Sequence, residues 1–335
     1  MINLDQATTH IRNEFLEEGM IESIKNGEYQ TYPPPTGLPE LQELVLHHFK
    51  LDGYPQPTAI ITNGAISPLY DLITKISKYY GIRHFIDSEP GWKWPRFYGQ
   101  QAPSLKLKKS KITPDDIEER DMVYICNPQN PIGFEYDESE LKALINKCEA
   151  TDSWFLYDCA YEAFIETLIP ACIMYDKVIT FFSFSKSPGT AGMRCGGVIL
   201  NQKWAGELMA IQRSQVGTNL PVQRGLINAY HHKAEWYPEL IAIHEMNRNY
   251  IYTNLSERYM FSQPDMSNSV WVDLPDDIQS DQLCAAAKAA GILLRDGKYY
   301  NYDSFTDNGN FIKIGTTVPP EWIDKAIKFL NSYKY

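Results

Sequence analysis

The feature that most constrains the fold is an alternation of short apolar runs with helical patterns up to about residue 200. Runs typical of strands recur near 59–62, 83–86, 121–126, 153–157, 178–184 and 193–200. Helical patterns lie between several of them, at 66–80 and 137–149, and an amphipathic helix is predicted at 37–49. Strands that alternate with helices are joined by right-handed crossovers, so the pattern predicts an α/β fold with a doubly wound, mainly parallel sheet.

The chain changes character after a helical segment predicted around 203–260. Beyond that segment, strands are predicted at 270–275, 291–295 and 310–317, and helices at 279–290 and 320–333. This mixture predicts a smaller α+β domain. At 335 residues the chain is long enough to form one large domain with a smaller partner.

The segment 181–197, FFSFSKSPGTAGMRCGG, is an apolar run that ends in a turn rich in Ser and Gly. The turn holds Lys186 and, eight positions later, Arg194. A desolvated lysine amine loses its proton readily and then condenses with an aldehyde to form a Schiff base. Ser183 and Ser185 offer hydroxyl groups to a phosphate, and Arg194 offers a guanidinium fork. By itself the segment fits either a pyridoxal phosphate site or a surface loop with an ordinary lysine.

Three more polar side chains follow apolar strands. Asp158 ends one strand, Tyr161 follows three residues later, and Asn130 lies in a turn dense in Asn, Pro and Gly. A carboxylate at a strand end can keep a pyridinium nitrogen protonated, and a phenol can donate to the oxygen of the ring. Because open α/β sheets bind ligands where their strands end, we expect these side chains at one site.

Two further segments fit the same site. The run 59–73 passes from a β-branched strand through Asn63-Gly64 into a helix, whose first N–H groups form an anion site. Trp92 follows a Pro-Gly turn, where its indole face could stack on a cofactor ring.

Together these motifs resemble the fold-type I pyridoxal phosphate enzymes, and within them the class I and II aminotransferases of the histidinol-phosphate aminotransferase-like branch. The family pattern Asn-Pro-x-x-Asn-Pro-x-Gly matches Asn127 to Gly133, and Asp-x-x-Tyr matches Asp158 to Tyr161. Ser-x-x-Lys with an arginine eight residues later matches Ser183, Lys186 and Arg194. Order and spacing both agree, and the similarity extends from about Tyr32 to Lys313.

The resemblance implies pyridoxal 5'-phosphate as the cofactor and a role for each matched residue. Lys186 would form the Schiff base and move the substrate proton, and Asp158 would pair with the pyridinium nitrogen. Asn130 and Tyr161 would hold the ring oxygen, and Trp92 would stack on the ring. The residues expected to bind the cofactor phosphate are Gly64, Ala65, Ser183, Ser185 and Arg194.

The resemblance also implies a homodimer with shared active sites. In this family a tyrosine ahead of a Gly-Leu-Pro-Glu-Leu segment reaches the phosphate of the neighbouring subunit, and Tyr32 precedes that segment here. The family's domain organisation implies a large cofactor-binding domain over 33–230. Residues 1–32 and 231–335 would form the small domain.

One position departs from the family pattern. Family members place an arginine before Ile or Leu in the C-terminal strand to hold the substrate's α-carboxylate, whereas this strand carries Lys313. Lysine keeps the charge but loses the fork. Lys313 and Asn130 are therefore the candidate substrate-binding residues. Four alternatives stay open: a tolerated replacement, a one-residue shift in the alignment, an unusual amine substrate, or a carboxylate held by Arg12 or Arg295.

These roles predict an aminotransferase that moves an amino group between an amino acid and a 2-oxo acid. The motifs bind the cofactor without deciding which bond to Cα breaks, so a lyase, decarboxylase or cyclase on the same fold is the alternative. A non-catalytic relative is a third possibility, disfavoured by the presence of both Lys186 and Asp158. No motif names the amino donor or acceptor.

Composition disfavours several other classes of function. The net charge of −11 argues against a general surface for nucleic acids or anionic membranes. The apolar runs are too short to span a bilayer, and the first ten residues lack the pattern of a secretion signal, so a cytoplasmic protein is expected. The six cysteines show no CxxC or metal-ligand spacing, and no metal is expected.

Overall fold

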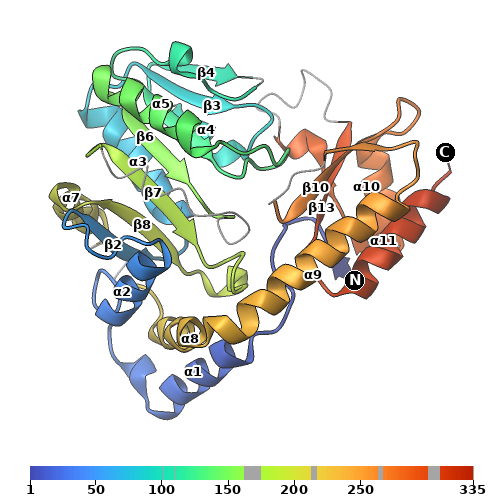
Figure 1. Ribbon diagram of the computed structural model, residues 1–335, viewed down its shortest axis with the longest axis horizontal. Helices are drawn as coiled ribbons and strands as arrows, with labels where there is room; N and C mark the ends of the chain where they lie inside the picture. Colours follow the sequence, from blue (N-terminus) through green and yellow to red (C-terminus); the bar gives the residue numbers. More distant parts are fainter. Residues whose placement is uncertain are drawn as a thin grey trace.

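A seven-stranded sheet lies at the centre of the larger part of the molecule (Figure 1). The computed structural model describes residues 1–100, 102–108, 110–161, 175–212, 217–262, 267–300 and 310–334. The strands of this sheet are β2 (Pro57–Thr62), β3 (His84–Ser88), β4 (Ser104–Lys108), β5 (Met122–Cys126), β6 (Trp154–Asp158), β7 (Val178–Ser183) and β8 (Gly196–Asn201). Their order is β2-β8-β7-β6-β5-β3-β4. Among the described strands of this sheet, β8 alone is antiparallel to its neighbours, so the predicted mainly parallel sheet is confirmed.

Helices cover both faces of the sheet. Successive side chains of its strands point in opposite directions, so the buried strands carry apolar side chains on both faces. Val123 and Ile125 pack in one core and Met122 and Tyr124 in the other. The first core also contains residues of α2 (Pro39–His48), α5 (Glu138–Ala150) and α8 (Leu220–His231). The second core contains residues of α3 (Ile66–Tyr79), against which α4 (Lys93–Gly99) packs, and of α7 (Gln202–Gln212).

The helical segment predicted around 203–260 is divided into α7, α8 and the 22-residue α9 (Lys233–Asn254). The N–H of Val222 donates to Oδ1 of Asn219 at 3.2 Å, which caps the start of α8, and Pro221 occupies its first turn. These local signals mark the start of a separate helix within the predicted helical segment. Helix α9 then runs from the large part of the molecule to the small one (Figure 1).

The smaller part contains a four-stranded antiparallel sheet, as the predicted α+β domain requires. Its order is β12 (Arg295–Asp296), β13 (Phe311–Gly315), β10 (Ser269–Asp273) and β9 (Met260–Phe261). Helices α10 (Ser280–Ala289) and α11 (Pro320–Ser332) pack in its core. Strand β1 (Ile2–Asn3) pairs in parallel with β11 (Ile292–Leu293), so the N-terminus joins this part of the molecule. Short 3₁₀ helices lie at Glu28–Gln30, Pro114–Asp116, Ala191–Met193 and Gly297–Tyr300.

Helix α1 (Glu14–Lys25) lies within the first 32 residues but packs against α8. Two glycines allow the close approach: a Cβ on Gly19 would lie 2.9 Å from the carbonyl oxygen of Arg224, and one on Gly225 would lie 2.6 Å from that of Leu16. Leu16 belongs to the core beneath the large sheet. The division of the chain into a large domain over 33–230 and a small domain formed by the rest stays a prediction. Helix α1 falls in the predicted small domain by sequence, but it contacts the large part of the molecule.

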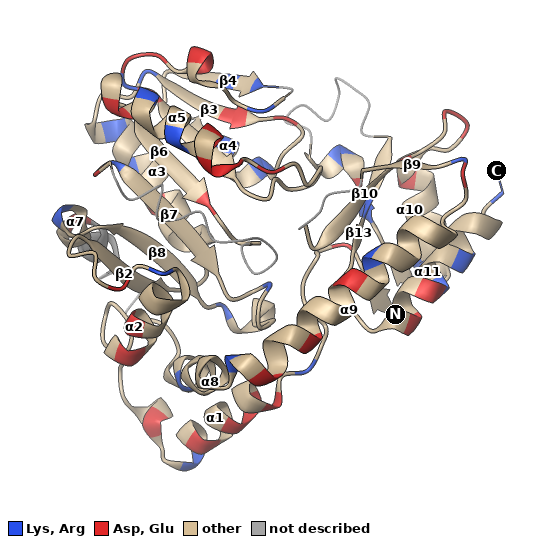
Figure 2. Ribbon diagram, viewed as in Figure 1, with Lys and Arg blue, Asp and Glu red and all other residues tan. Residues whose placement is uncertain are grey.

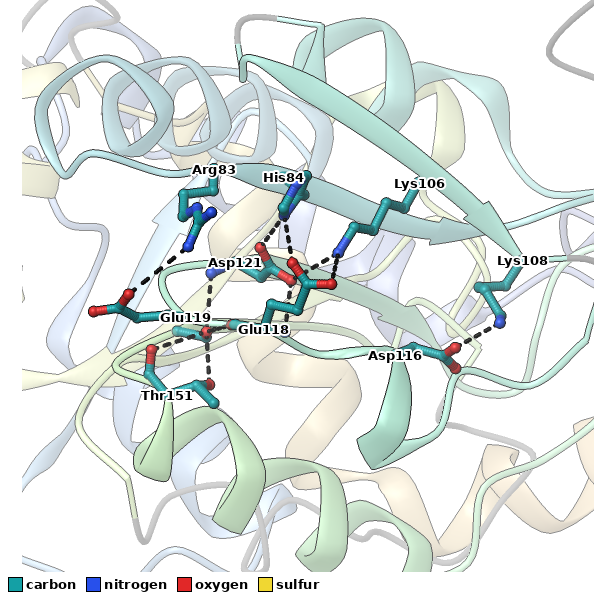
Figure 3. A network of polar contacts seen from close by, with 10 residues as sticks. Arg83, His84, Lys106, Lys108, Asp116, Glu118, Glu119, Asp121 and Thr151 are labelled. Carbon is teal, nitrogen blue, oxygen red and sulfur yellow. Dashed lines mark hydrogen bonds and ion pairs between the residues drawn. The ribbon is translucent and has the colours of Figure 1, made fainter.

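A polar network closes the edge of the sheet where the parallel strands begin (Figure 3). Asp121 is fully buried there: its carboxylate contacts Nδ1 of His84 at 2.6 Å and accepts the N–H of Glu118 at 2.9 Å. Lys106, on edge strand β4, lies 3.2 Å from Glu118 and 3.6 Å from Asp121. This network pairs the charged side chains at the amino ends of the parallel strands. A ligand site is therefore expected at their carboxyl ends.

Charged residues of both signs lie along α1, α9 and α11, whereas the central strands of the large sheet are nearly free of them (Figure 2). This distribution follows from burial, since charged side chains are rarely buried without partners. Among the described residues, no helix has the length and apolar character needed to cross a membrane.

Candidate active site

A cavity of about 340 Å³ lies where β5, β6 and β7 end and where the small sheet faces them. Its volume is within the range of small-molecule sites in proteins, about 300–1,000 Å³. Ten of the residues predicted for the site line it: Ala65, Trp92, Asn130, Asp158, Tyr161, Ser183, Ser185, Lys186, Arg194 and Lys313. The shared edge explains this convergence, because the crossovers of a parallel sheet bring the carboxyl ends of its strands together.

Lys186 lies on the loop after β7, with its amine in the cavity. Nζ donates to the carbonyl oxygen of Gln6 at 2.7 Å and lies 5.3 Å from the centre of the Tyr161 ring. Burial lowers the pKa of Lys186 to about 8, although the negative charge of Asp158 acts in the opposite direction. The amine is thus held near the cavity wall and loses its proton more readily than an ordinary lysine.

Asp158, the last residue of β6, is buried and accepts two hydrogen bonds. The hydroxyl of Tyr124 donates to Oδ2 at 2.6 Å, and the N–H of Ala160 donates to Oδ1 at 2.9 Å. Burial raises the pKa of Asp158, while the hydrogen bond from Tyr124 favours the charged form. Tyr124 was not among the predicted site residues, since an aromatic residue inside a strand gives no signal beyond packing.

The other end of the cavity is built to receive an anion. Gly64 has φ +75°, and a Cβ on it would lie 2.6 Å from Nη2 of Arg194. A second close approach occurs at Gly196, where a Cβ would lie 2.8 Å from the backbone nitrogen of Ala65. Helix α3 begins directly after Ala65, so its free N–H groups point toward the same end. Gly64 therefore lies beside Arg194, although it is not itself among the residues that line the cavity.

Arg194 itself has a left-handed backbone, with φ +57° and ψ +63°. This conformation costs a residue other than glycine about 1–2 kcal/mol. Nη1 of Arg194 donates to the carbonyl oxygen of Ala191 at 2.7 Å, which fixes the guanidinium against its own loop. The cradle of glycine backbone, helix start and guanidinium fits the phosphate of pyridoxal 5'-phosphate, so the residues present suit the group that the sequence predicted.

Lys313 enters the cavity from β13 and is only 2% exposed. Its Nζ donates to Oδ1 of Asn130 at 3.2 Å and lies 5.3 Å from the centre of the Tyr300 ring. Burial, followed by the nearby charges of Lys186 and Arg295, holds the pKa of Lys313 well below its ordinary value. The two residues predicted for substrate binding, Lys313 and Asn130, are thus in direct contact.

The two alternative cations have different surroundings. Arg295 lies opposite Lys313 in the β12–β13 pair, lines the cavity and forms an ion pair with Asp5 at 3.0 Å. Arg12 is mostly exposed and pairs with Glu17 on helix α1, away from the cavity-lining residues. The geometry therefore retains Arg295, but not Arg12, as a second cation for a substrate.

Tyr32 does not join the other predicted residues within this chain. Its side chain is 84% exposed and does not line the cavity. The family role predicted for it requires a neighbouring subunit, so the exposure of Tyr32 leaves that role a prediction.

Sequence reasoning singled out none of several lining residues that come from the N-terminal segment and from the segment after β12. The N-terminal segment supplies Asp5, Gln6 and Thr8, and the segment after β12 supplies Tyr299 and Tyr300. Pairing of β1 with β11 and the hydrogen bond from the N–H of Gly315 to the carbonyl of Leu4 at 2.8 Å bring the N-terminus to the cavity. No local motif marks these residues, because their place depends on pairing across nearly the whole chain.

The chain matches the family model for aminotransferase class I and II over residues 3–330. It is 33% identical over 144 residues to the LL-diaminopimelate aminotransferase of Bacteroides fragilis, covering 41% of this chain and 34% of that protein. It is 25% identical over 236 residues to the histidinol-phosphate aminotransferase of Methanococcus maripaludis, covering 66% of this chain and 62% of that protein. The matched segments thus span about a third to three fifths of the lengths of these relatives.

Solved structures with a similar fold include an aminotransferase from Mycobacterium tuberculosis, with a TM-score of 0.84 and 17% identity over 99% of this chain and 91% of that one. A pyridoxal-phosphate-bound C-S lyase from Staphylococcus hominis has a TM-score of 0.81 and 19% identity over 98% of this chain and 90% of that one. At these identities the likeness shows the fold. The match over residues 3–330 confirms the resemblance inferred from the motifs. The chain belongs to the aminotransferase class I and II family, whose members depend on pyridoxal phosphate.

Proposed function

We propose that this protein is a pyridoxal-phosphate-dependent aminotransferase that moves an amino group between an amino acid and a 2-oxo acid. The observation that carries the proposal is one cavity containing the Lys186 amine, the buried Asp158 carboxylate and the phosphate cradle around Arg194. When bound, the cofactor supplies an aldehyde that condenses with amines and a ring that withdraws electrons. Curated relatives that are aminotransferases support transamination over the alternative chemistries.

The proposal gives each residue the role that the family resemblance implies. Lys186 would bind the cofactor covalently, and its Nζ would be the base that moves a proton from the substrate's Cα. Asp158 would hold a proton on the pyridine nitrogen, and the hydrogen bond from Tyr124 keeps that carboxylate oriented. Tyr161 and Asn130 would donate to the ring oxygen, and Trp92 would pack on the ring face. The residues proposed for the phosphate are Gly64, Ala65, Ser183, Ser185 and Arg194.

The substrate side of the cavity is proposed to bind a carboxylate through Lys313. Arg295 lies opposite Lys313 in the β12–β13 pair, and the Asp5 carboxylate forms an ion pair with Arg295. An incoming carboxylate would make the same charge-assisted hydrogen bonds with these cations. This arrangement supports amino acids and 2-oxo acids as the substrate class.

We further propose a homodimer in which Tyr32 reaches the cofactor phosphate of the partner subunit. The 84% exposure of Tyr32 supports this role, since the large aromatic side chain lies free of its own subunit. A cytoplasmic location stays a prediction.

The proposal is tested by adding pyridoxal phosphate to the purified protein and recording its absorbance while amino donors are screened. We expect a yellow protein whose spectrum changes to the pyridoxamine form with one donor and returns with 2-oxoglutarate or pyruvate. Borohydride should fix the cofactor to Lys186, as mass spectrometry of peptides would show. Release of ammonia or carbon dioxide in place of the pyridoxamine form would favour the lyase or decarboxylase alternative, and an adduct on another lysine would refute the site.

A further inference from the structure

Arg96, in helix α4, is the largest side chain that is completely buried among the described residues, with 0% exposure. Its guanidinium lies between the end of β3 and the small domain. It donates from Nε to Oδ2 of Asp87 at 3.1 Å and from Nη2 to the carbonyl oxygen of Ser88 at 2.9 Å. From Nη1 it donates to Glu89 and to the carbonyl oxygen of Tyr300, each at 3.4 Å. One buried cation thus joins two parts of the molecule.

The carbonyl oxygen of Tyr300 also accepts a hydrogen bond from the loop between β3 and α4, where the N–H of Gly91 donates to it at 3.1 Å. No side chain fits at Gly91: a Cβ there would lie 2.4 Å from Nη2 of Arg96 and 2.5 Å from the carbonyl oxygen of Ser88. Pro90 precedes Gly91, and its carbonyl oxygen accepts a hydrogen bond from Nε2 of Gln129 at 2.6 Å. The loop between β3 and α4 is therefore fixed from both sides around Arg96.

Both ends of this linkage reach the cavity. Trp92 directly follows the fixed loop and lines the cavity on the side proposed for the cofactor. Tyr300 lines it on the side proposed for the substrate, where its ring lies 5.3 Å from Nζ of Lys313. A displacement of the Tyr300 backbone would move the aromatic ring against which the Lys313 amine rests.

We propose that Arg96 is a positioning residue of the active site, which sets the distance between Trp92 and Tyr300 by tying the β3–α4 loop to the small domain. The inference rests on the proposed function, because it assigns Trp92 to the cofactor and Lys313 to the substrate. A planar guanidinium suits this task, since its donors reach several acceptors at once in a rigid geometry. Lysine offers a single point charge and cannot span Asp87, Ser88 and Tyr300 together.

A purely structural role would be to neutralise Asp87, and the test must separate the two. Arg96→Lys keeps a cation beside Asp87 but loses the reach to Tyr300. We expect a rise of about tenfold or more in the amino donor's KM, because small misplacements of substrate-positioning groups cost up to about a hundredfold in rate. Binding of pyridoxal phosphate to Lys186 should persist, and the visible circular dichroism of the bound cofactor should change. Arg83→Lys, at an exposed arginine paired with Glu119, is the matched control and should leave all three unchanged.

Gly91→Ala should reproduce the kinetic effect of Arg96→Lys, because the added methyl group displaces the guanidinium. If Arg96→Lys fails to fold, the double variant Asp87→Asn with Arg96→Met takes its place, since it removes both charges of the buried Asp87–Arg96 pair together. Burial raises the pKa of Asp87 to about 6, so the charged form is less favoured here than in a free aspartate. The double variant should show the same raised KM.

The inference is overturned if the variants lose only thermal stability and keep the wild-type KM, turnover and circular dichroism. A wild-type protein that shows no reaction with any donor would instead refute the proposed function. The two failures are distinguishable because the first requires an active wild-type enzyme.

Discussion

The hydroxyl of Tyr124 donates a hydrogen bond to Oδ2 of Asp158 at 2.6 Å, between neighbouring strands of the large sheet. Tyr124 lies on β5 and Asp158 at the end of β6, and both are buried. The bond favours the ionised carboxylate against the effect of burial, so a residue within the sheet adjusts the charge of a residue at its edge.

Tyr124→Phe should weaken catalysis by raising the pKa of Asp158 further. The acid limb of the kcat/KM profile should move to higher pH, because a protonated Asp158 no longer stabilises a charged ring nitrogen. The loss should be roughly ten- to hundredfold, matching the 1.5–3 kcal/mol of a hydrogen bond to a charged group. Rate measurements across pH check this, with Tyr79→Phe at an exposed position as the control. An unmoved acid limb would contradict the role.

Asp158→Ala should leave the fold and much of the cofactor binding intact while reducing turnover by about a hundredfold or more. The physical reason is the loss of a preorganised electrostatic partner for the ring. Single-turnover absorbance changes measure the rate, and far-ultraviolet circular dichroism checks the fold. Near-normal turnover would mean that the carboxylate is only structural.

Capture of pyridoxal phosphate by Lys186 should depend on pH in a defined window. The pKa of this amine is lowered from 10.5 to about 8, so the rate of capture should rise through about pH 8 and then level off. Between these two values the native protein binds fewer protons than the unfolded chain, so the contribution of Lys186 to stability increases as pH rises from about 8 toward 10.5. Stopped-flow absorbance of the cofactor-free protein checks the first effect; a rate still rising steeply far above pH 8 would refute it.

Lys313→Ala should raise the KM for the amino donor if Lys313 holds the substrate carboxylate. It should also lower turnover, because the α-proton would be misplaced relative to Lys186. Lys313→Arg should preserve or improve binding of ordinary α-amino acids, since a planar fork matches a carboxylate. Steady-state kinetics of both variants decide the matter, and Lys203→Ala, at an exposed position of α7, is a control. Unchanged kinetics in Lys313→Ala would exclude the anchoring role.

Tyr32→Phe and Lys186→Ala should each reduce or abolish activity on their own if the sites are shared across a dimer. Mixed and reassembled subunits should recover part of the activity, because one of the two sites in a heterodimer then has both Lys186 and the partner subunit's Tyr32. Activity assays after reassembly, with light scattering to measure the mass, check the prediction. No recovery, or full activity in a monomer, would argue against sharing.

The sequence was most informative where the candidate site residues lie at the ends of strands. Asp158, Lys186 and Asn130 follow apolar runs, and the run itself predicts the strand by local periodicity. Parallel connections then bring those ends to one edge, so a one-dimensional pattern was enough to group the residues. Periodicity indicated helix around 203–260 without marking its division into α7, α8 and α9, and the cap at Asn219 begins α8.

The sequence by itself thus determined the order of strands and helices, the strand-end chemistry and the family. The tertiary structure alone decided that Tyr124 supports Asp158, that the carbonyl of Gln6 receives the Lys186 amine, and that Arg96 reaches the carbonyl of Tyr300. The last two contacts join residues 180 and 204 positions apart in the chain. Local periodicity does not predict such contacts. They depend on how whole layers pack and on which buried backbone groups lack a hydrogen bond within their own helix or strand.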